Sequence, residues 1–418
     1  MRSAPGRALG LDRRRAGAPG RPQVPLEGRA LSILHLVTRL ERGGSSDCTL
    51  WQALGAARRR HRVTVVSGPA PEPSPLVERA RREGLVRFLE IPQLVRRPDP
   101  RRDLYALLAI VRLLRREPFD IIHTHTSKAG ALGRLAALLV GRRGAVVHQP
   151  HGHLFYGYYG RTRTALVTTA ERLLAPLARV QVALSWRGAE EHLCRGIGRP
   201  GRFVAIRSGI DLRPFRHASA RRGACRARLA IGPDEVVVGS LCRLEAIKGP
   251  GDLVAGFARA SLTRPRLRLL IAGDGPLRGS LLARAEAAGL RGRVTITGRW
   301  EAPEEFLPAL DLFVLASRNE GMGRALVEAM ACGLPVVACA VGGVPEVLEE
   351  GRAGLLIPPS DPEAIGMAIG RLADAPELAA LMGRRARARA IAFGAGRMVR
   401  SLLRLYREVA SDPREEAA

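Results

Sequence analysis

Lysine, asparagine and aromatic residues are scarce in this chain of 418 residues. Only Lys128 and Lys248 are lysine among 67 basic residues, Asn319 is the only asparagine, and aromatic residues make up 4%. Arginine is therefore the default surface cation, as expected for a GC-rich genome, and the net charge of +28 by itself says little about partners. With few aromatic rings for base stacking and no Cys-x₂-Cys pair, the sequence argues against a nucleic-acid-binding protein.

Other absences bear on where the protein works. The six cysteines lack paired spacing, which favours reduced thiols and a cytoplasmic location. No apolar run is long enough to span a bilayer. Residues 1–30 are rich in Arg, Pro and Gly and lack an apolar segment, so we expect a disordered basic tail and no signal peptide. The positive charge suits an anionic membrane surface or a phosphorylated substrate.

From residue 31 onward, short β-rich runs alternate with helical patterns, and the alternation begins again after residue 212. Such alternation predicts an α/β protein with two Rossmann-like domains, at residues 31–212 and 213–394, each with a doubly wound parallel sheet. The strands are expected at 32–38, 62–67, 120–125, 145–148, 180–184 and 204–208, and then at 236–241, 267–272, 294–297, 312–315, 335–338 and 355–357.

Two of the expected helices are strongly amphipathic. In residues 103–116, Leu104, Leu107, Leu108 and Val111 form one apolar stripe. The last helix, residues 395–410, is expected to pack back on the first domain. Its four arginines, at positions 397, 400, 404 and 407, share one face opposite apolar residues. An ordinary packed and solvated helix explains that pattern, and membrane contact is the alternative.

Ligands of open α/β sheets bind beyond the carboxyl ends of the strands, so the residues that follow each strand are candidates for a site. In the first domain, Gly43 and Gly44 follow the first strand. Glycines there let backbone amides approach an anion at the start of a helix, although Gly-Gly is also an ordinary turn. His151 follows a later strand, whereas His123 and His125 are expected to be hydrogen-bonded histidines of the core.

In the second domain, Arg243 and Lys248 follow the first strand and together suit a diphosphate, because Arg offers a bidentate fork and Lys a point charge. Arg243 is also readily explained as one more exposed cation. Further along, a loop with Glu320 leads into a helix that begins near Gly323 and exposes free amides. Glu328 then lies one to two turns into that helix, where it is either a hydroxyl acceptor or a plain helix residue.

Several common motifs are missing. The chain has no Asp-x-Asp sequence that could hold a metal on a diphosphate, so Arg, Lys and helix dipoles are expected to neutralise the charge. It also has neither a P-loop motif nor a complete Gly-x-Gly-x-x-Gly after a strand, which argues against an ATPase or a dinucleotide-binding enzyme.

Taken in order, these motifs resemble the retaining glycosyltransferases of family 4, which have the GT-B architecture of two Rossmann-like domains facing across a cleft. The resemblance covers about residues 31–410. It rests on Gly-Gly after the first strand, HTHTSKAG at 123–130, PHGH at 150–153, SGID at 208–211, Arg-x₄-Lys at 243–248, AGDGP at 272–276 and EGMGRALVEAMACGLPVV at 320–337.

The resemblance implies a role for each site residue. Arg243 and Lys248 would hold the donor diphosphate and stabilise the departing nucleoside diphosphate. Glu320 would bind sugar hydroxyls, Glu328 the ribose, and His151 would lie near the reacting centre. The implied catalytic set is His151, Arg243, Lys248 and Glu320, and the implied donor-binding set is Gly43, Gly44, Gly321, Met322, Gly323 and Glu328.

The implied function is transfer of a hexose or N-acetylhexosamine from a UDP- or GDP-linked sugar to a polyprenyl-diphosphate-linked or growing glycan. The resemblance places this reaction in capsule or exopolysaccharide synthesis, without a metal or other cofactor, at the inner face of the cytoplasmic membrane. Two alternatives stay open: an epimerase of the UDP-N-acetylglucosamine type, and a non-catalytic subunit that binds nucleotide sugars.

Overall fold

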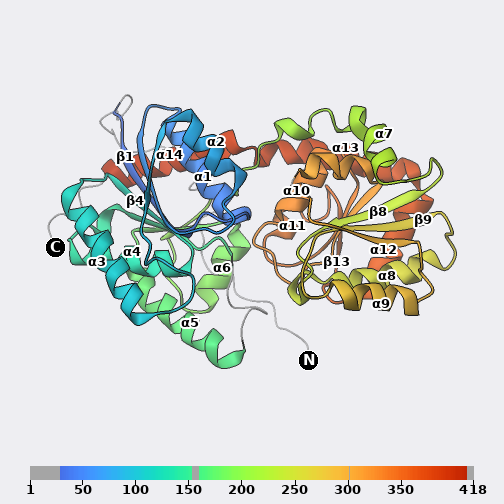
Figure 1. Ribbon diagram of the computed structural model, residues 1–418, viewed down its shortest axis with the longest axis horizontal. Helices are drawn as coiled ribbons and strands as arrows, with labels where there is room; N and C mark the ends of the chain where they lie inside the picture. The colour runs from blue at the N-terminus through green and yellow to red at the C-terminus, as the bar shows by residue number, and fades with distance from the viewer. Residues whose placement is uncertain (1–28, 153–159, 301, 412–418) are drawn as a thin grey trace. The chain divides into compact units, whose positions relative to one another are not determined.

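The computed structural model describes residues 29–152, 160–300 and 302–411 (Figure 1). These residues form two compact units. Unit 1 comprises residues 29–152, 160–207 and 398–411, and unit 2 comprises the described residues from 208 to 397. Apart from its last two residues, the expected basic tail at 1–30 lies outside the described residues, as does His153 of the PHGH string.

Unit 1 contains a seven-stranded sheet in the order β3-β2-β1-β4-β5-β6-β7, in which every pair is parallel. Its strands are β1 (Ser32–Arg39), β2 (Arg62–Gly68), β3 (Val86–Glu90), β4 (Ile121–His125), β5 (Val146–Gln149), β6 (Val180–Ala183) and β7 (Phe203–Ala205). Its helices are α1 (Gly44–Ala57), α2 (Pro75–Glu83), α3 (Pro100–Arg116), α4 (Ser127–Leu139), α5 (Arg161–Leu174), α6 (Trp186–Cys194) and most of α14 (Ala395–Ser411).

Unit 2 contains a six-stranded parallel sheet in the order β10-β9-β8-β11-β12-β13. Its strands are β8 (Val236–Leu241), β9 (Leu267–Ala272), β10 (Val294–Gly298), β11 (Leu312–Leu315), β12 (Val336–Cys339) and β13 (Leu355–Ile357). Its helices are α7 (Ala218–Arg228), α8 (Pro250–Ser261), α9 (Arg278–Ala287), α10 (Arg324–Ala331), α11 (Val344–Val347), α12 (Pro362–Asp374) and α13 (Pro376–Ala390). The expected fold, two parallel α/β domains, is confirmed.

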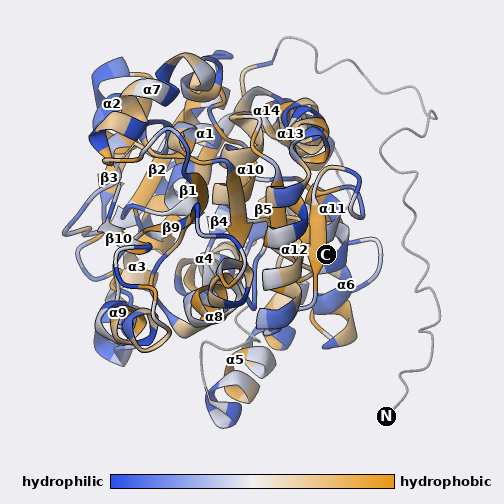
Figure 2. Ribbon diagram, turned by 90° about the vertical axis from the view of Figure 1, so that its right-hand side faces the viewer, coloured by the Kyte–Doolittle hydropathy of each residue, from blue (hydrophilic) through white to orange (hydrophobic). Residues whose placement is uncertain are grey.

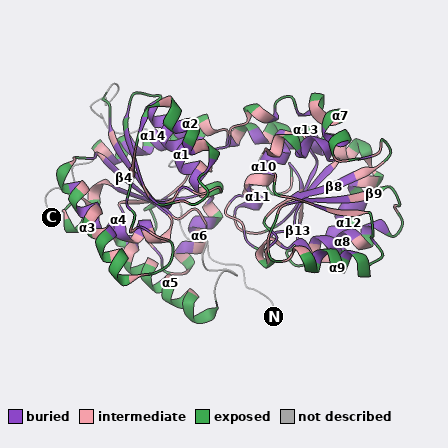
Figure 3. Cartoon of the chain, in the orientation of Figure 1, coloured by how far each residue is buried: buried purple, intermediate pink, exposed green. Residues whose placement is uncertain are grey.

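The central strands are buried on both faces, because helices cover each side of a parallel sheet (Figures 2 and 3). Strands β11 and β12 accordingly consist almost entirely of apolar residues. Strand β4 is different. Its five residues are all buried, yet its sequence IIHTH carries His123 and His125 into the interior. Buried imidazoles need hydrogen-bond partners, and the neighbouring strands β1 and β5 also carry buried polar residues, among them His35 and His148.

In each unit, an aspartate joins the first strand to the neighbouring central strand by the same pair of hydrogen bonds. Asp120, just before β4, accepts a hydrogen bond from the Ser32 amide at 2.7 Å and donates its own amide to the Ser32 carbonyl. Asp311, just before β11, exchanges the same two bonds with Val237 of β8. A hydrogen bond to a charged group contributes about 1.5–3 kcal/mol. The two aspartates thus set the register in which the site loops leave the sheets.

Helix α14 packs on unit 1 with its apolar side, including Leu402 and Tyr406, fully buried. It lies directly against α1, where a side chain at Gly55 would meet Val399 at 2.3 Å. The four arginines of α14 are exposed. The helix is thus packed on one side and solvated on the other, which is the ordinary explanation of its pattern. Among the helices of the described residues, none combines the length and apolarity needed to cross a membrane.

Helix α3 is present where expected, but its buried face differs from the predicted stripe. The buried residues are Ala106, Ile110, Val111 and Leu114, whereas Leu104 and Leu108 are 55% and 43% exposed. The helix carries apolar residues over more than half its circumference. Periodicity therefore located the helix and did not select which apolar face meets the sheet.

Candidate active site

Glu320 lies in the loop that follows β11 in unit 2, where it is held by two side chains. Lys248 donates a hydrogen bond from Nζ to Oε1 of Glu320 at 2.7 Å, and Ser317 donates one from Oγ to the same oxygen at 2.8 Å. The Lys248 and Glu320 side chains are 17% and 13% exposed, so the ion pair is partly shielded from water. A shielded pair of this kind keeps both groups in fixed positions.

The backbone of the Glu320 loop is fixed by Gly342, which follows β12. A side chain at Gly342 would place its first carbon 1.9 Å from the Glu320 carbonyl oxygen, and the φ of 48° at this glycine disfavours other residues. The next amide, of Gly343, donates to the same carbonyl at 3.3 Å. The sequence analysis did not predict that Ser317, Gly342 and Gly343 belong to the site. The pair Gly342-Gly343 nevertheless follows a strand, as the predicted pair Gly43-Gly44 does, so the same pattern could have identified it.

Arg243 and Lys248 both follow β8, on either side of a short turn. Arg243 is exposed and pairs with Glu245 at 2.5 Å, so the structure does not pair it with Glu320. Burial raises the pKa of the Cys242 thiol, next to Arg243 in the chain, to about 11. The ion pair places Lys248 beside Glu320, whereas Arg243 shares with Lys248 only the loop that follows β8.

Helix α10 begins directly after this loop, with Gly323 as its N-cap. The helix start lies where the sequence predicted it, and its N-cap is a glycine, which has no side chain of its own to cap the first amides. Met322 is buried and packs into the core with its side chain, so only its backbone can face a ligand. Glu328 is 2% exposed and accepts a 2.8 Å hydrogen bond from Arg324 one turn earlier. Its contact with a ribose stays a prediction.

Gly43 and Gly44 lie at the start of α1 in unit 1. Gly43 is the N-cap, with a φ of 155° that residues with side chains rarely adopt. A Cβ atom added at either glycine would meet no atom within 4 Å, so packing does not explain why glycine stands there. The helix behind them is almost entirely buried. A rigid helix with an open glycine loop at its N-terminus is a suitable place for a phosphate.

His151 follows β5, and its backbone adopts a left-handed conformation with a φ of 62°. Such a conformation is uncommon for residues other than glycine and marks local strain. The ring is half-buried and contacts His125 at the end of β4, with Nε2 of His151 2.8 Å from Nδ1 of His125. Burial lowers the pKa of His151 to about 3. The side chain is therefore neutral at physiological pH.

The residues of unit 2 have complementary chemical abilities. A lysine and a helix N-terminus attract a phosphate or diphosphate, and a fixed carboxylate accepts hydrogen bonds from sugar hydroxyls. In unit 1, the glycine loop offers backbone amides and His151 offers a neutral imidazole. Two Rossmann-like units with these groups at the carboxyl ends of their strands are typical of the GT-B class of glycosyltransferases.

Comparisons with known proteins agree with this class. The family model for glycosyltransferase family 4 matches residues 42–213, and the model for group 1 glycosyl transferases matches residues 222–389. A D-inositol 3-phosphate glycosyltransferase of Streptomyces griseus is 31% identical over 328 residues, which cover 72% of this chain and 69% of the relative. The chain therefore belongs to glycosyltransferase family 4, and it is a glycosyltransferase.

Other relatives extend the comparison. A UDP-Gal:alpha-D-GlcNAc-diphosphoundecaprenol alpha-1,3-galactosyltransferase of Escherichia coli is 28% identical, over 69% of this chain and 75% of its own length. For a D-inositol 3-phosphate glycosyltransferase of Segniliparus rotundus, 34% identical, the match spans only 47% of the relative and 50% of this chain. The crystal structure of Anabaena HepE in complex with UDP has the same fold, with a TM-score of 0.75, 23% identity and coverage of 90% of this chain and 100% of HepE.

Proposed function

We propose that this glycosyltransferase transfers a hexose or N-acetylhexosamine from a UDP- or GDP-linked sugar to a polyprenyl-diphosphate-linked or growing glycan, with retention of the anomeric configuration. The pairing of Lys248 with Glu320 beside the N-terminus of α10 is the observation that carries this proposal. It provides a cation for the diphosphate and a carboxylate for the sugar within one loop. The lipid-linked acceptor named for the Escherichia coli relative supports the choice of acceptor class.

In the proposed reaction, the bond between the sugar C1 and the diphosphate oxygen breaks while the acceptor oxygen bonds to C1 on the same face. The acceptor proton passes to the departing phosphate oxygen. Lys248 and Arg243 offset the negative charge that develops on the diphosphate, and Glu320 holds the sugar. Neutralisation by these side chains needs no divalent ion, so we propose a metal-independent enzyme that acts in cell-surface polysaccharide synthesis.

A donor screen tests this proposal directly. The purified protein is incubated with UDP- and GDP-linked hexoses and N-acetylhexosamines, with a polyprenyl-diphosphate-linked sugar as acceptor, and with EDTA present or absent. We expect one donor to be consumed at equal rates with and without EDTA, and the product to keep the donor's anomeric configuration by NMR. An inverted product would refute retention. Conversion of a UDP-sugar to its epimer would identify an epimerase, and donor binding without turnover a non-catalytic subunit.

We also propose that the enzyme binds the inner face of the cytoplasmic membrane through α5 of unit 1. Leu166 and Leu173 lie seven residues apart on this helix and are 71% and 74% exposed. Arg161 and Arg163 on the same helix are exposed as well, and Figure 3 shows that much of α5 is exposed. Exposed apolar side chains next to cations suit the interface of an anionic bilayer. The exposed arginines of α14 add electrostatic attraction only, because the apolar side of that helix is buried.

Vesicle sedimentation tests this surface. We expect salt-sensitive binding to vesicles that contain anionic lipid, and weak binding to zwitterionic vesicles. The double substitution Leu166→Asp and Leu173→Asp should reduce binding, whereas Leu262→Asp, which changes an 84% exposed leucine of unit 2, should not. Equal losses in both variants, or equal binding to both vesicle types, would show that α5 is not the contact surface.

A further inference from the structure

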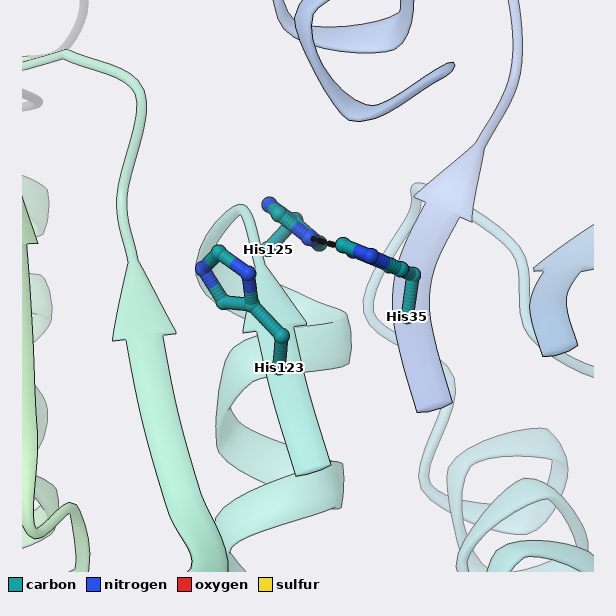
Figure 4. Close-up of side chains that lie close together, drawn as sticks. All are labelled: His35, His123 and His125. Carbon is teal, nitrogen blue, oxygen red and sulfur yellow. Dashed lines mark hydrogen bonds between the residues drawn. The ribbon is translucent and has the colours of Figure 1, made fainter. Parts of the chain in front are cut away.

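Three histidines of unit 1 form a continuous hydrogen-bonded row across adjacent loops and strands. Nδ1 of His35, in β1, lies 2.9 Å from Nε2 of His125, in β4, and Nδ1 of His125 lies 2.8 Å from Nε2 of His151 (Figure 4 shows the first of these contacts). His35 and His125 are completely buried. The row therefore leads from the interior of the sheet to the histidine proposed for the active site.

All three imidazoles are neutral. Burial lowers the pKa of His35 and of His151 to about 3, and burial, followed by the charges of the neighbouring histidines, holds the pKa of His125 well below its usual range. A neutral imidazole has one N–H and one bare nitrogen. Each contact in the row needs one donor and one acceptor, so the tautomer of any one ring fixes the other two.

Only two arrangements of the ring protons satisfy both contacts. The surroundings of Nε2 of His35, at the buried end of the row, decide between them. Nε2 of His35 has no hydrogen-bond partner among the described residues. A buried N–H without a partner is rarer than a buried acceptor without one. The favourable arrangement leaves this nitrogen bare and places the proton of His35 on Nδ1. His35 then donates to His125, and His125 donates to His151.

We propose that His35 and His125 are positioning residues that hold His151 in the Nδ1–H tautomer. This inference rests on the proposed role of His151 in the active site. With Nε2 occupied as an acceptor, His151 presents only an N–H to a substrate. It therefore donates a hydrogen bond to a sugar hydroxyl or phosphate oxygen, and it does not serve as the base that deprotonates the acceptor.

A metal ion is the competing explanation for the cluster. Nitrogens of His35, His123 and His125 lie within 4.8 Å of one another, which is close enough for one ion to contact all three side chains. The cluster contains no carboxylate, so a divalent ion would bring uncompensated charge into a buried site. His123 contacts the hydroxyl of Tyr406 through Nδ1 at 2.6 Å, while its Nε2 has no hydrogen-bond partner among the described residues. The hydrogen-bonded row accounts for the geometry without this penalty.

Histidine tautomers can be read by NMR of the full chain labelled with ¹⁵N-histidine, assigned through single substitutions. We expect His35, His125 and His151 all to carry the proton on Nδ1, which free histidine side chains disfavour. Detection of the proton on Nε2 of His151 would overturn the proposal. Stoichiometric zinc or another transition metal in the purified protein, lost in a His35 variant, would overturn it as well.

Two substitutions at His35 separate positioning from packing. In His35→Asn, the side-chain amide nitrogen replaces Nδ1 as donor, so His151 should keep its tautomer and the turnover number should stay close to that of the wild type. In His35→Leu the donor is lost, the tautomers of His125 and His151 become mixed, and kcat should fall about tenfold with little change in the donor KM.

His148→Leu is the matched control. His148, in strand β5 next to β4, is as buried as His35, but its hydrogen-bond partner is Thr124, which is not part of the histidine row. It should destabilise the protein to a similar extent and leave the tautomer of His151 unchanged. An unchanged tautomer in His35→Leu would refute the coupling. A wild-type protein that transfers no sugar would refute the proposed function instead, and the NMR result would still decide the tautomer.

Discussion

Replacing Lys248 by methionine is expected to lower kcat for sugar transfer by about 10²-fold to 10³-fold, the usual effect of removing one group that stabilises charge in a transition state. Methionine keeps the length and apolar volume of the side chain and removes only the charge. The diphosphate then departs without its nearest fixed cation, and Glu320 keeps Ser317 but loses its charged partner. Donor turnover at saturating donor and acceptor measures this effect.

The other lysine of the chain provides a matched control. Lys128 pairs with Asp103 at 2.6 Å and is 15% exposed, closely resembling Lys248 with Glu320, but it lies in unit 1 and has no role in the proposed site. Lys128→Met should therefore destabilise the fold about as much as Lys248→Met and leave kcat per folded molecule unchanged. Equal activity in the two variants would mean that the Lys248 pair is merely structural.

The fold could be predicted because each strand and helix carries its own local signal. β8, β9, β11 and β13 begin and end at the expected residues, since each is a short apolar run bounded by polar or turn residues. β3 was missed. Its sequence, VRFLE, is polar at both its second and its last position, because this edge strand is only partly buried. Local apolarity thus identifies a uniformly apolar strand, such as the edge strand β13, and misses an edge strand of mixed polarity, such as β3.

Helix ends were harder to predict where glycine and small polar residues begin a helix. The helical pattern that follows the first strand predicts a helix that begins near Thr49, yet α1 begins at Gly44. Residues 44–48, GSSDC, have low helix propensity, but burial of the helix on the sheet compensates for it. This error matters for the site, because it moves the helix N-terminus to the glycine loop.

Some residues of the candidate site could be identified from a local sequence motif, whereas the contacts that hold them come from distant positions in the chain. Glu320 and the start of α10 were found from one continuous string, and Lys248 from its rarity. The contacts that hold Glu320 come from positions distant in sequence, such as Gly342, and a single sequence does not show which loop a glycine will approach. Likewise, His125 was expected to be a core histidine, and it is buried, but its contact with His151 depends on the pairing of β4 with β5.

His151→Ala is expected to lower kcat by about 10²-fold, because one hydrogen-bond donor to the reacting groups is lost. His151→Asn should recover most of this loss, since its amide nitrogen lies close to the position of Nδ1. Turnover is measured for both variants with the same donor and acceptor. The buried His61, which accepts a hydrogen bond from the Leu31 amide at the opposite end of the strands, supplies the control His61→Ala, which should reduce stability without reducing kcat.

The pH dependence of the same variants distinguishes a donor from a base. Because burial lowers the pKa of His151 to about 3, the ring is neutral from about pH 5 to pH 8, and its protonation would begin only far below that range. The profiles of the wild type and of His151→Ala should therefore run parallel across this interval, offset by a constant factor. A limb that rises with a pKa near 6.5 in the wild type and disappears in His151→Ala would instead show that His151 titrates as a base. In that case its neutral form would be needed as a proton acceptor, and the N–H that we assign to its exposed nitrogen would be absent.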